Sequence, residues 1–160
     1  MKSYNLDRID IAILSQLQQD NRIANQALAA QVGLSPPACL QRVKRLRESG
    51  IILQEAAMLD PQLAGHGLQL IVSVEMERDR QEIYREFREA VLAAKEVTQC
   101  YQVTGEVDFI LLISVRDIHA YEKFIDRVLH SNSNIRKFHS SISIRTVKFE
   151  TALNLEEHGD

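Results

Sequence analysis

The stretch GLSPPACLQRVKRLRESG, residues 33–50, restricts the fold of this chain more than any other segment. Gly33 can adopt the positive φ that ends a helix. Ser35 followed by Pro36 is typical of a helix start, because proline at the first helical position loses no hydrogen bond. Gly50 supplies the next stop signal. The segment therefore predicts a tight turn followed by one helix that runs from Pro36 to Gly50.

The two faces of this predicted helix differ in chemistry. At about 100° per residue, one face is apolar and consists of Cys39, Val43 and Leu46. The opposite face is mostly polar and consists of Pro37, Gln41, Lys44 and Glu48. We expect the first face to pack inward and the second to point into solvent.

Two helical patterns precede the turn. Leu6, Ile9, Ile13 and Leu17 recur at helical spacing, and Asp7 with Asp10 resembles a capping box in which Asp replaces Glu. Asn25 is the predicted N-cap of the second helix. Three helices with a tight turn before the third are the plan of a winged-helix-like helix-turn-helix domain.

Charge supports nucleic acid as the partner of this region. Residues 1–50 hold seven Lys or Arg against four Asp or Glu, although the whole chain has a net charge of −3. We predict that the major groove is met by Ser35, Pro37, Ala38 and Gln41, near the start of the third helix. We predict that phosphates are held by Arg42, Lys44 and Arg45. The alternative is an ordinary solvated basic face.

The rest of the chain has the pattern of a second domain. The stretch DPQLAGHG, residues 60–67, contains a proline and two glycines, and residues 53–66 are predicted to be a connector. Alternating strands and amphipathic helices then follow in the order β-α-β-β-α-β, which is the ferredoxin-like arrangement. The predicted fold class is thus α+β. The predicted division is residues 1–52 (DNA binding), 53–66 (linker), 67–152 (ferredoxin-like) and 153–160 (tail).

Three details of the second domain are specific enough to test. Gly105-Glu106 predicts a two-residue hairpin turn. The change of apolar phase along residues 135–150 predicts a bulge near Arg145. Both helices should cover one face of the sheet, which leaves the other face for a second copy of the chain. A dimer would also suit two DNA half-sites about 34 Å apart.

The motifs LDRIDIAIL, RIANQALAAQVGLS, RVKRLRESGII and VTQCYQVTGEVDFILLISV, in this order, resemble the Lrp/AsnC family of transcriptional regulators. The resemblance covers residues 6–149. It implies a sequence-specific DNA-binding regulator that forms dimers and octamers, and whose activity or assembly responds to a free amino acid. It places the effector loop at VTGEVD.

The chemistry of that loop suits an amino acid. Asp108 or Glu106 can accept from the ammonium group, and backbone N–H groups around Gly105 can hold the carboxylate. The remaining predicted effector residues are polar side chains, with the serines supplied by a neighbouring subunit: Tyr101, Gln102, Thr104, Ser140, Ser141 and Ser143. The alternative is that Gly105 serves only the turn and that Asp108 pairs locally.

Other chemistry finds little support. The five histidines and two cysteines show no metal-ligand spacing, so we expect neither a metal nor another cofactor, and no catalytic residues. The start of the chain lacks a signal peptide pattern, and we expect a cytoplasmic, nucleoid-associated protein without a membrane partner. Two other functions stay open: a DNA-bending architectural protein without an effector, and a small metabolic enzyme on the ferredoxin-like half.

Overall fold

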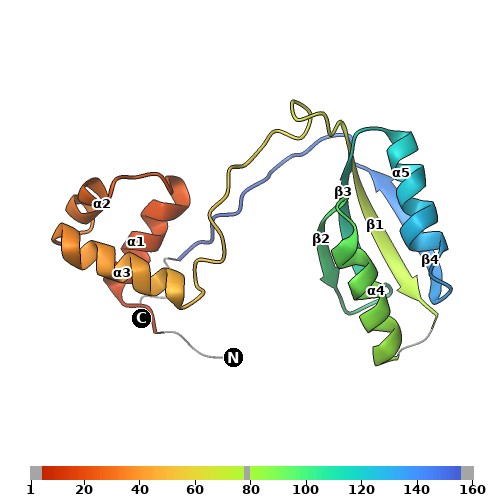
Figure 1. Ribbon diagram of the computed structural model, residues 1–160, viewed down its shortest axis with the longest axis horizontal. Coiled ribbons are helices and arrows are strands. Elements are labelled where there is room, and N and C mark those ends of the chain that lie inside the picture. The colour runs from red at the N-terminus through yellow and green to blue at the C-terminus, as the bar shows by residue number, and fades with distance from the viewer. Residues whose placement is uncertain (1–4, 78–79, 156–160) are drawn as a thin grey trace. The chain divides into compact units, whose positions relative to one another are not determined.

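The computed structural model describes residues 5–77 and 80–155 (Figure 1). Contacts divide the chain into two compact units, Met1–Ala57 with Lys148–Asp160, and Met58–Val147. The first unit holds α1 (Arg8–Gln19), α2 (Asn25–Gln31) and α3 (Pro36–Glu48). The second unit holds four strands and the remaining helices. The predicted fold class, a helix-turn-helix followed by an α+β domain, is confirmed.

The first unit is organised around the apolar stripes of its three helices. Its buried core consists of Ile13, Leu14, Leu28, Ala29, Cys39, Val43 and Leu46. The turn between α2 and α3 is built by Gly33, whose φ is +70°, and by a hydrogen bond from the Leu34 N–H to the Ala29 carbonyl. The predicted inward face of α3 is therefore confirmed, and so is the tight turn that precedes it.

The predicted capping of the helices is right at α1 and wrong at α2. Asp7 and Asp10 form the capping box reciprocally. Asn25 is the first residue of α2 and follows the N-cap, Ala24. The Asn25 side-chain amide donates instead to the Pro36 carbonyl at 2.8 Å, which ties α2 to the start of α3. Ser35 is the N-cap of α3, but its hydroxyl makes no capping bond.

The C-terminal segment packs on the first unit rather than ending as a free tail. The Gln18 side chain donates to the Leu153 carbonyl and accepts from the Leu153 N–H, at 3.0 and 2.6 Å. Leu155 is partly buried against the core of the first unit. The domain boundary thus differs from the predicted one, because residues after 147 belong to the first unit. Residues 156–160 of the predicted tail lie outside the described residues.

The second unit is a four-stranded antiparallel sheet in the order β2-β3-β1-β4. The strands are β1 (Leu68–Met76), β2 (Val97–Gln102), β3 (Phe109–Val115) and β4 (Ile135–Ile142). β3 and β1 are central, and their alternate residues are fully buried. The chain order and the pairing are those of the predicted ferredoxin-like arrangement.

Both helical segments of this unit lie on the same face of the sheet, as predicted (Figure 1). They are α4 (Gln81–Ala93), α5 (Ile118–Phe124) and the π-helical turn η1 (Ile125–His130), which continues α5. Phe87, Phe109 and Phe124 are fully buried between the helices and the sheet. The opposite face, which we call the open face, carries no helix of this unit.

Two predicted irregularities are wrong. The turn between β2 and β3 is longer than two residues, because its closing hydrogen bond joins the Val103 N–H to the Asp108 carbonyl at 2.9 Å and residues 104–107 lie beyond it. The bulge near Arg145 is absent, since β4 already ends at Ile142. The register shift lies instead opposite the start of β4, between Glu75 and Met76. The apolar residues after β4 do not continue the sheet, and Ile144 is 99% exposed.

Candidate nucleic-acid interface and effector region

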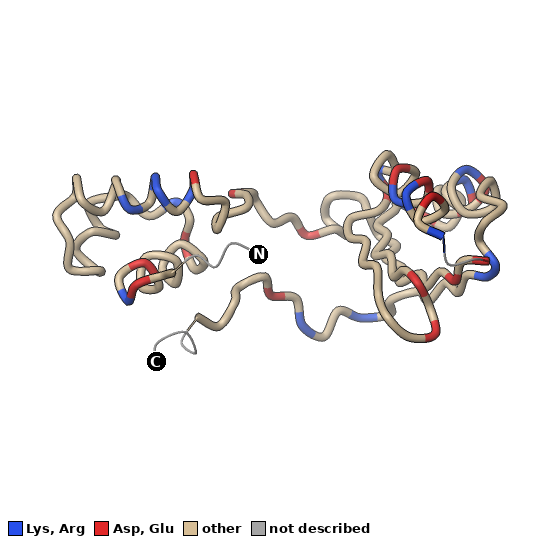
Figure 2. Tube along the Cα trace, turned by 90° about the horizontal axis from the view of Figure 1, so that it is seen from below, with Lys and Arg blue, Asp and Glu red and all other residues tan. Residues whose placement is uncertain are grey.

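The outer face of α3 is the candidate DNA surface. Pro37, Gln41 and Lys44 are exposed on it, and the Lys44 side chain is 73% exposed with only a 3.7 Å contact to Glu48. Ser35 is also exposed, while Ala38 is half-buried. In the unit that contains the three helices, Lys and Arg follow one another along α3 (Figure 2). An exposed helix start with an amide and a cation beside it can enter a major groove.

Two of the three predicted phosphate ligands, Arg42 and Arg45, form ion pairs with carboxylates of the same chain. Arg42 Nη1 lies 2.6 Å from an Asp7 carboxylate oxygen and 2.9 Å from an Asp10 oxygen. Arg45 Nη2 lies 2.6 Å from both oxygens of Asp10. Asp10 is 1% exposed and is the one buried charged residue in the described part of the chain. Arg42 and Arg45 are thus ion-pair partners of α1, whereas Lys44 makes only the longer contact to Glu48.

The sequence assigned Asp10 only to the capping box and missed this second role. The position of Asp10 could have indicated this role. Asp10, Ile13 and Leu17 recur at helical spacing and share the inward side of α1. An acid on an inward stripe needs a buried partner, and the basic helix α3 offers two. Asp7, at the rim of the cluster, has its pKa lowered mainly by the hydrogen bond from Arg42.

The predicted effector residues do not lie together in one chain. Tyr101 pairs with Ile110 and Ser141 pairs with Ile71, on the open face. Gln102 pairs with Phe109, under the helices. Ser140 is also on the helix side, where its hydroxyl contacts the Tyr121 hydroxyl. Alternation along each strand therefore separates neighbouring residues that the sequence had grouped.

The serines are also far from the loop. β2 and β4 are the two edges of the sheet, with β3 and β1 between them. At about 4.8 Å per strand, the edges are about 14 Å apart. One amino acid cannot span that distance, so Ser140, Ser141 and Ser143 cannot join the loop after β2 within one chain. Ser143 donates its N–H to the carbonyl of Gln69 in β1.

Asp108 braces the loop after β2. One of its carboxylate oxygens accepts from the Met76 N–H at 2.7 Å, and the other accepts from the Tyr84 hydroxyl at 2.7 Å. The Asp108 N–H also donates to the Val74 carbonyl. Asp108 therefore connects β1, α4 and the start of β3, which leaves Thr104, Gly105 and Glu106 as the exposed members of the loop. Gly105 has a φ of +124°, which disfavours any other residue there.

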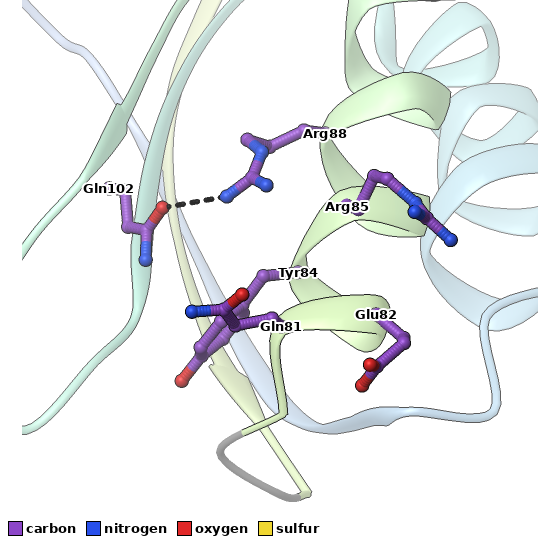
Figure 3. A pocket seen from close by; sticks show the side chains of 6 residues that line it. All are labelled: Gln81, Glu82, Tyr84, Arg85, Arg88 and Gln102. Carbon is purple, nitrogen blue, oxygen red and sulfur yellow. Dashed lines mark hydrogen bonds between the residues drawn. The ribbon is translucent and has the colours of Figure 1, made fainter.

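A shallow hollow of about 530 Å³ lies beside α4, lined by Gln81, Glu82, Tyr84, Arg85, Arg88 and Gln102 (Figure 3). Arg88 donates to the Gln102 side-chain oxygen at 3.1 Å. Arg85 points away from Arg88, so the two cations do not converge on one ligand. The side chain of Gln102 thus lies in this hollow, bonded to Arg88. The hollow adds no further ligand-binding side chain to the loop after β2.

Residues 5–77 and 80–155 contain neither a candidate metal site nor a candidate membrane-spanning helix. No group of three or more His, Cys, Asp or Glu there is arranged to hold a metal ion. No helix in the same residues is long and apolar enough to cross a membrane. Burial raises the pKa of the Cys39 and Cys100 thiols. His158, one of the histidines considered above, lies outside the described residues.

Comparison with known families matches both units. Residues 6–52 match the winged helix-turn-helix DNA-binding family, and residues 69–153 match the Lrp/AsnC ligand binding domain. The chain belongs to the Lrp/AsnC family. As a member of this family with a helix-turn-helix, it is a DNA-binding transcriptional regulator.

Relatives match most or nearly all of the length of this Lrp/AsnC protein. An uncharacterized HTH-type transcriptional regulator of Sinorhizobium fredii is 38% identical over 94% of this chain and 89% of its own length. The leucine-responsive regulatory protein of Haemophilus influenzae is 40% identical over 78% of this chain and 75% of its own. Among solved structures, a transcriptional regulator of Neisseria meningitidis in complex with L-Met has a TM-score of 0.88. It is 35% identical and covers 95% of this chain and 98% of its own.

Proposed function

We propose that this regulator reads DNA with the start and outer face of α3. Ser35, Pro37, Ala38 and Gln41 meet base edges, and Lys44 meets a phosphate. The observation that carries this proposal is the burial of Cys39, Val43 and Leu46, which fixes Gln41 and Lys44 on the exposed side. Glutamine can pair with an adenine edge, and a lysine without a strong partner can neutralise a phosphate.

Substituting Lys44 and Gln41 should have different effects. Lys44→Ala is expected to weaken binding to every duplex and to lower the slope of log affinity against log salt by about one. Gln41→Ala is expected mainly to relax sequence preference. Affinity is measured by fluorescence anisotropy over a range of salt, with a duplex selected from a random pool. Lys95→Ala removes an exposed cation from the second unit and is the control; equal effects of Lys44→Ala and Lys95→Ala would contradict the proposed surface.

We further propose that a free amino acid is the effector and that it binds at the loop after β2. Support comes from the exposed Thr104, Gly105 and Glu106, from the match to a ligand binding domain, and from the relative solved with L-Met. Glu106 supplies a carboxylate for the ammonium group, and Asp108 holds the loop in place through Met76 and Tyr84.

Calorimetry with a panel of the twenty amino acids tests the effector. At least one is expected to bind and to change the set of duplexes selected from a random pool. Glu106→Gln is expected to weaken that binding at least tenfold, since one charge-assisted hydrogen bond contributes about 1.5–3 kcal/mol. Glu89→Gln, on the exposed side of α4, is the matched control. No heat with any amino acid would favour an architectural protein without an effector.

We propose that the protein acts in the cytoplasm as a homodimer or an octamer of four dimers. Apolar residues on the open face and along the extended segments support self-association: Leu53, Leu63, Ile71, Ile144 and Val147 are all exposed in the single chain. Such residues are normally covered when a protein works in an assembly. A second copy would also supply the serines of β4 that one chain cannot bring to the loop.

A further inference from the structure

The buried carboxylate of Asp10 is the centre of a network that joins α1 to the recognition helix α3. It accepts from the Asp7 N–H at 3.3 Å, from Arg42 at 2.9 Å and from Arg45 at 2.6 Å. No buried side-chain polar atom in the described residues lacks a partner, so this network is complete. It lies on the flank of α3, beside the face that carries Gln41 and Lys44.

The network is better suited to orientation than to stability. A buried ion pair contributes little net stability, because removing both charges from water offsets most of their attraction. Apolar side chains would join two helices at least as well. Hydrogen bonds to a carboxylate, however, have narrow geometry. Arg42 and Arg45 are three residues apart on α3, so both bonds to Asp10 are made only at one rotation of α3 about its axis.

The same bonds occupy the arginines. The Arg42 side chain is 27% exposed and the Arg45 side chain is 50% exposed, against 73% for Lys44. A cation already neutralised by a carboxylate displaces fewer counterions when DNA binds. Arg42 and Arg45 are therefore expected to neutralise a DNA phosphate less effectively than Lys44.

We propose that Asp10 is a positioning residue for DNA recognition, which holds Arg42 and Arg45 on the protein so that they orient α3 and do not neutralise phosphates. This inference rests on the proposed DNA surface of α3 and revises the prediction that all three cations hold phosphates. Lys44 is then the phosphate ligand of the segment. The preference of the protein for its own sequence depends on Asp10, although Asp10 does not touch DNA.

The test measures affinity against salt for the full chain, with the selected duplex and a scrambled duplex. Lys44→Gln and Arg45→Gln remove one charge each from neighbouring positions, so they are matched. Lys44→Gln is expected to lower the salt slope by about one, and Arg45→Gln is expected to leave it unchanged while weakening preference for the selected duplex. Asp10→Asn is expected to steepen the slope by about one, because it releases an arginine to a phosphate.

A drop of the slope by about one in Arg45→Gln would overturn the proposal, since Arg45 would then be an ordinary phosphate ligand. A folded Asp10→Asn protein with an unchanged slope and unchanged preference would also overturn it, because Asp10 would then serve only the fold. If Asp10→Asn does not fold, the comparison of the other two variants decides alone. An unchanged slope in Lys44→Gln would instead refute the DNA surface itself, and the inference would fall with it.

Discussion

Replacing Phe109 by alanine is expected to lower the free energy of unfolding of the second unit by about 3–5 kcal/mol. Phe109 is fully buried at the start of the central strand β3. Its ring packs against Phe87 with centroids 4.7 Å apart, and against Tyr84 edge-on at 5.5 Å. Alanine would leave a cavity between α4 and the sheet and would remove both aromatic contacts. Asp108, which braces the loop after β2, is the preceding residue and would lose support.

Urea denaturation followed by the far-ultraviolet circular dichroism of the full chain measures this loss. Leu92→Ala is the control, because Leu92 is 86% exposed on the outer side of α4 and should change stability by no more than about 0.5 kcal/mol. The description of the core between α4 and the sheet would be contradicted if the two variants were equally stable.

Replacing Gln41 by glutamate is expected to reduce affinity for the selected duplex by about 100-fold, the upper part of the range for losing one good base contact. The substitution removes the amide donor and brings a carboxylate among phosphates. Gln41 is exposed on the outer face of α3, so the fold has no need of its amide. Affinity for the selected duplex is measured at one fixed salt concentration, together with the stability of the variant.

Gln54→Glu provides the control for net charge. Gln54 is exposed in the segment after α3, and its substitution changes the charge of the protein by the same amount. It is expected to weaken binding less than about threefold, since a single distant charge is screened beyond about 10 Å in 0.1 M salt. Equal losses in the two variants would mean that overall charge, and not a groove contact, governs binding.

Local periodicity predicted most of the fold correctly, because the spacing of apolar residues along a short segment determines which face of a helix or strand is buried. The stripe of Cys39, Val43 and Leu46 correctly predicted which face of α3 is buried. The capping box of Asp7 and Asp10 was equally local. In the same way, every second residue along most of β1 is buried, which is the local period of a strand.

Contacts between residues distant in sequence were missed. Arg45 is 35 residues from Asp10, and nothing in the spacing of either helix indicates that they meet. Asn25 caps nothing because the Pro36 carbonyl, 11 residues away, accepts from its side chain. Likewise, Asp108 is bonded to Met76 and Tyr84 of other elements. The roles predicted for these polar residues, a helix cap for Asn25 and ligand binding for Arg45 and Asp108, did not take account of these partners within the protein.

The strand end at Ile142 shows another limit of periodicity. Ile142 and Ile144 alternate with polar residues in one phase, and Val147 and Phe149 do so in the other. Ile144, Val147 and Phe149 are nevertheless exposed and lie outside the sheet. Their pattern predicts a bulged continuation of β4, which is wrong. The chain instead leaves the sheet there and, through Leu153 and Leu155, packs on the first unit. Hydrophobic spacing alone does not say which unit, or which copy of the chain, covers a residue.

Crosslinking from position 41 tests the central claim most directly. In a Cys100→Ser background, where Cys39 is buried and unreactive, Gln41→Cys and Gln54→Cys are each labelled with a short photoreactive group and irradiated on the selected duplex. The label at position 41 is expected to join bases of the major groove, and the label at position 54 is expected to join none. Two results would show that α3 does not lie in the groove. In the first, the duplex binds but position 41 gives no crosslinks; in the second, positions 41 and 54 give equal crosslinks.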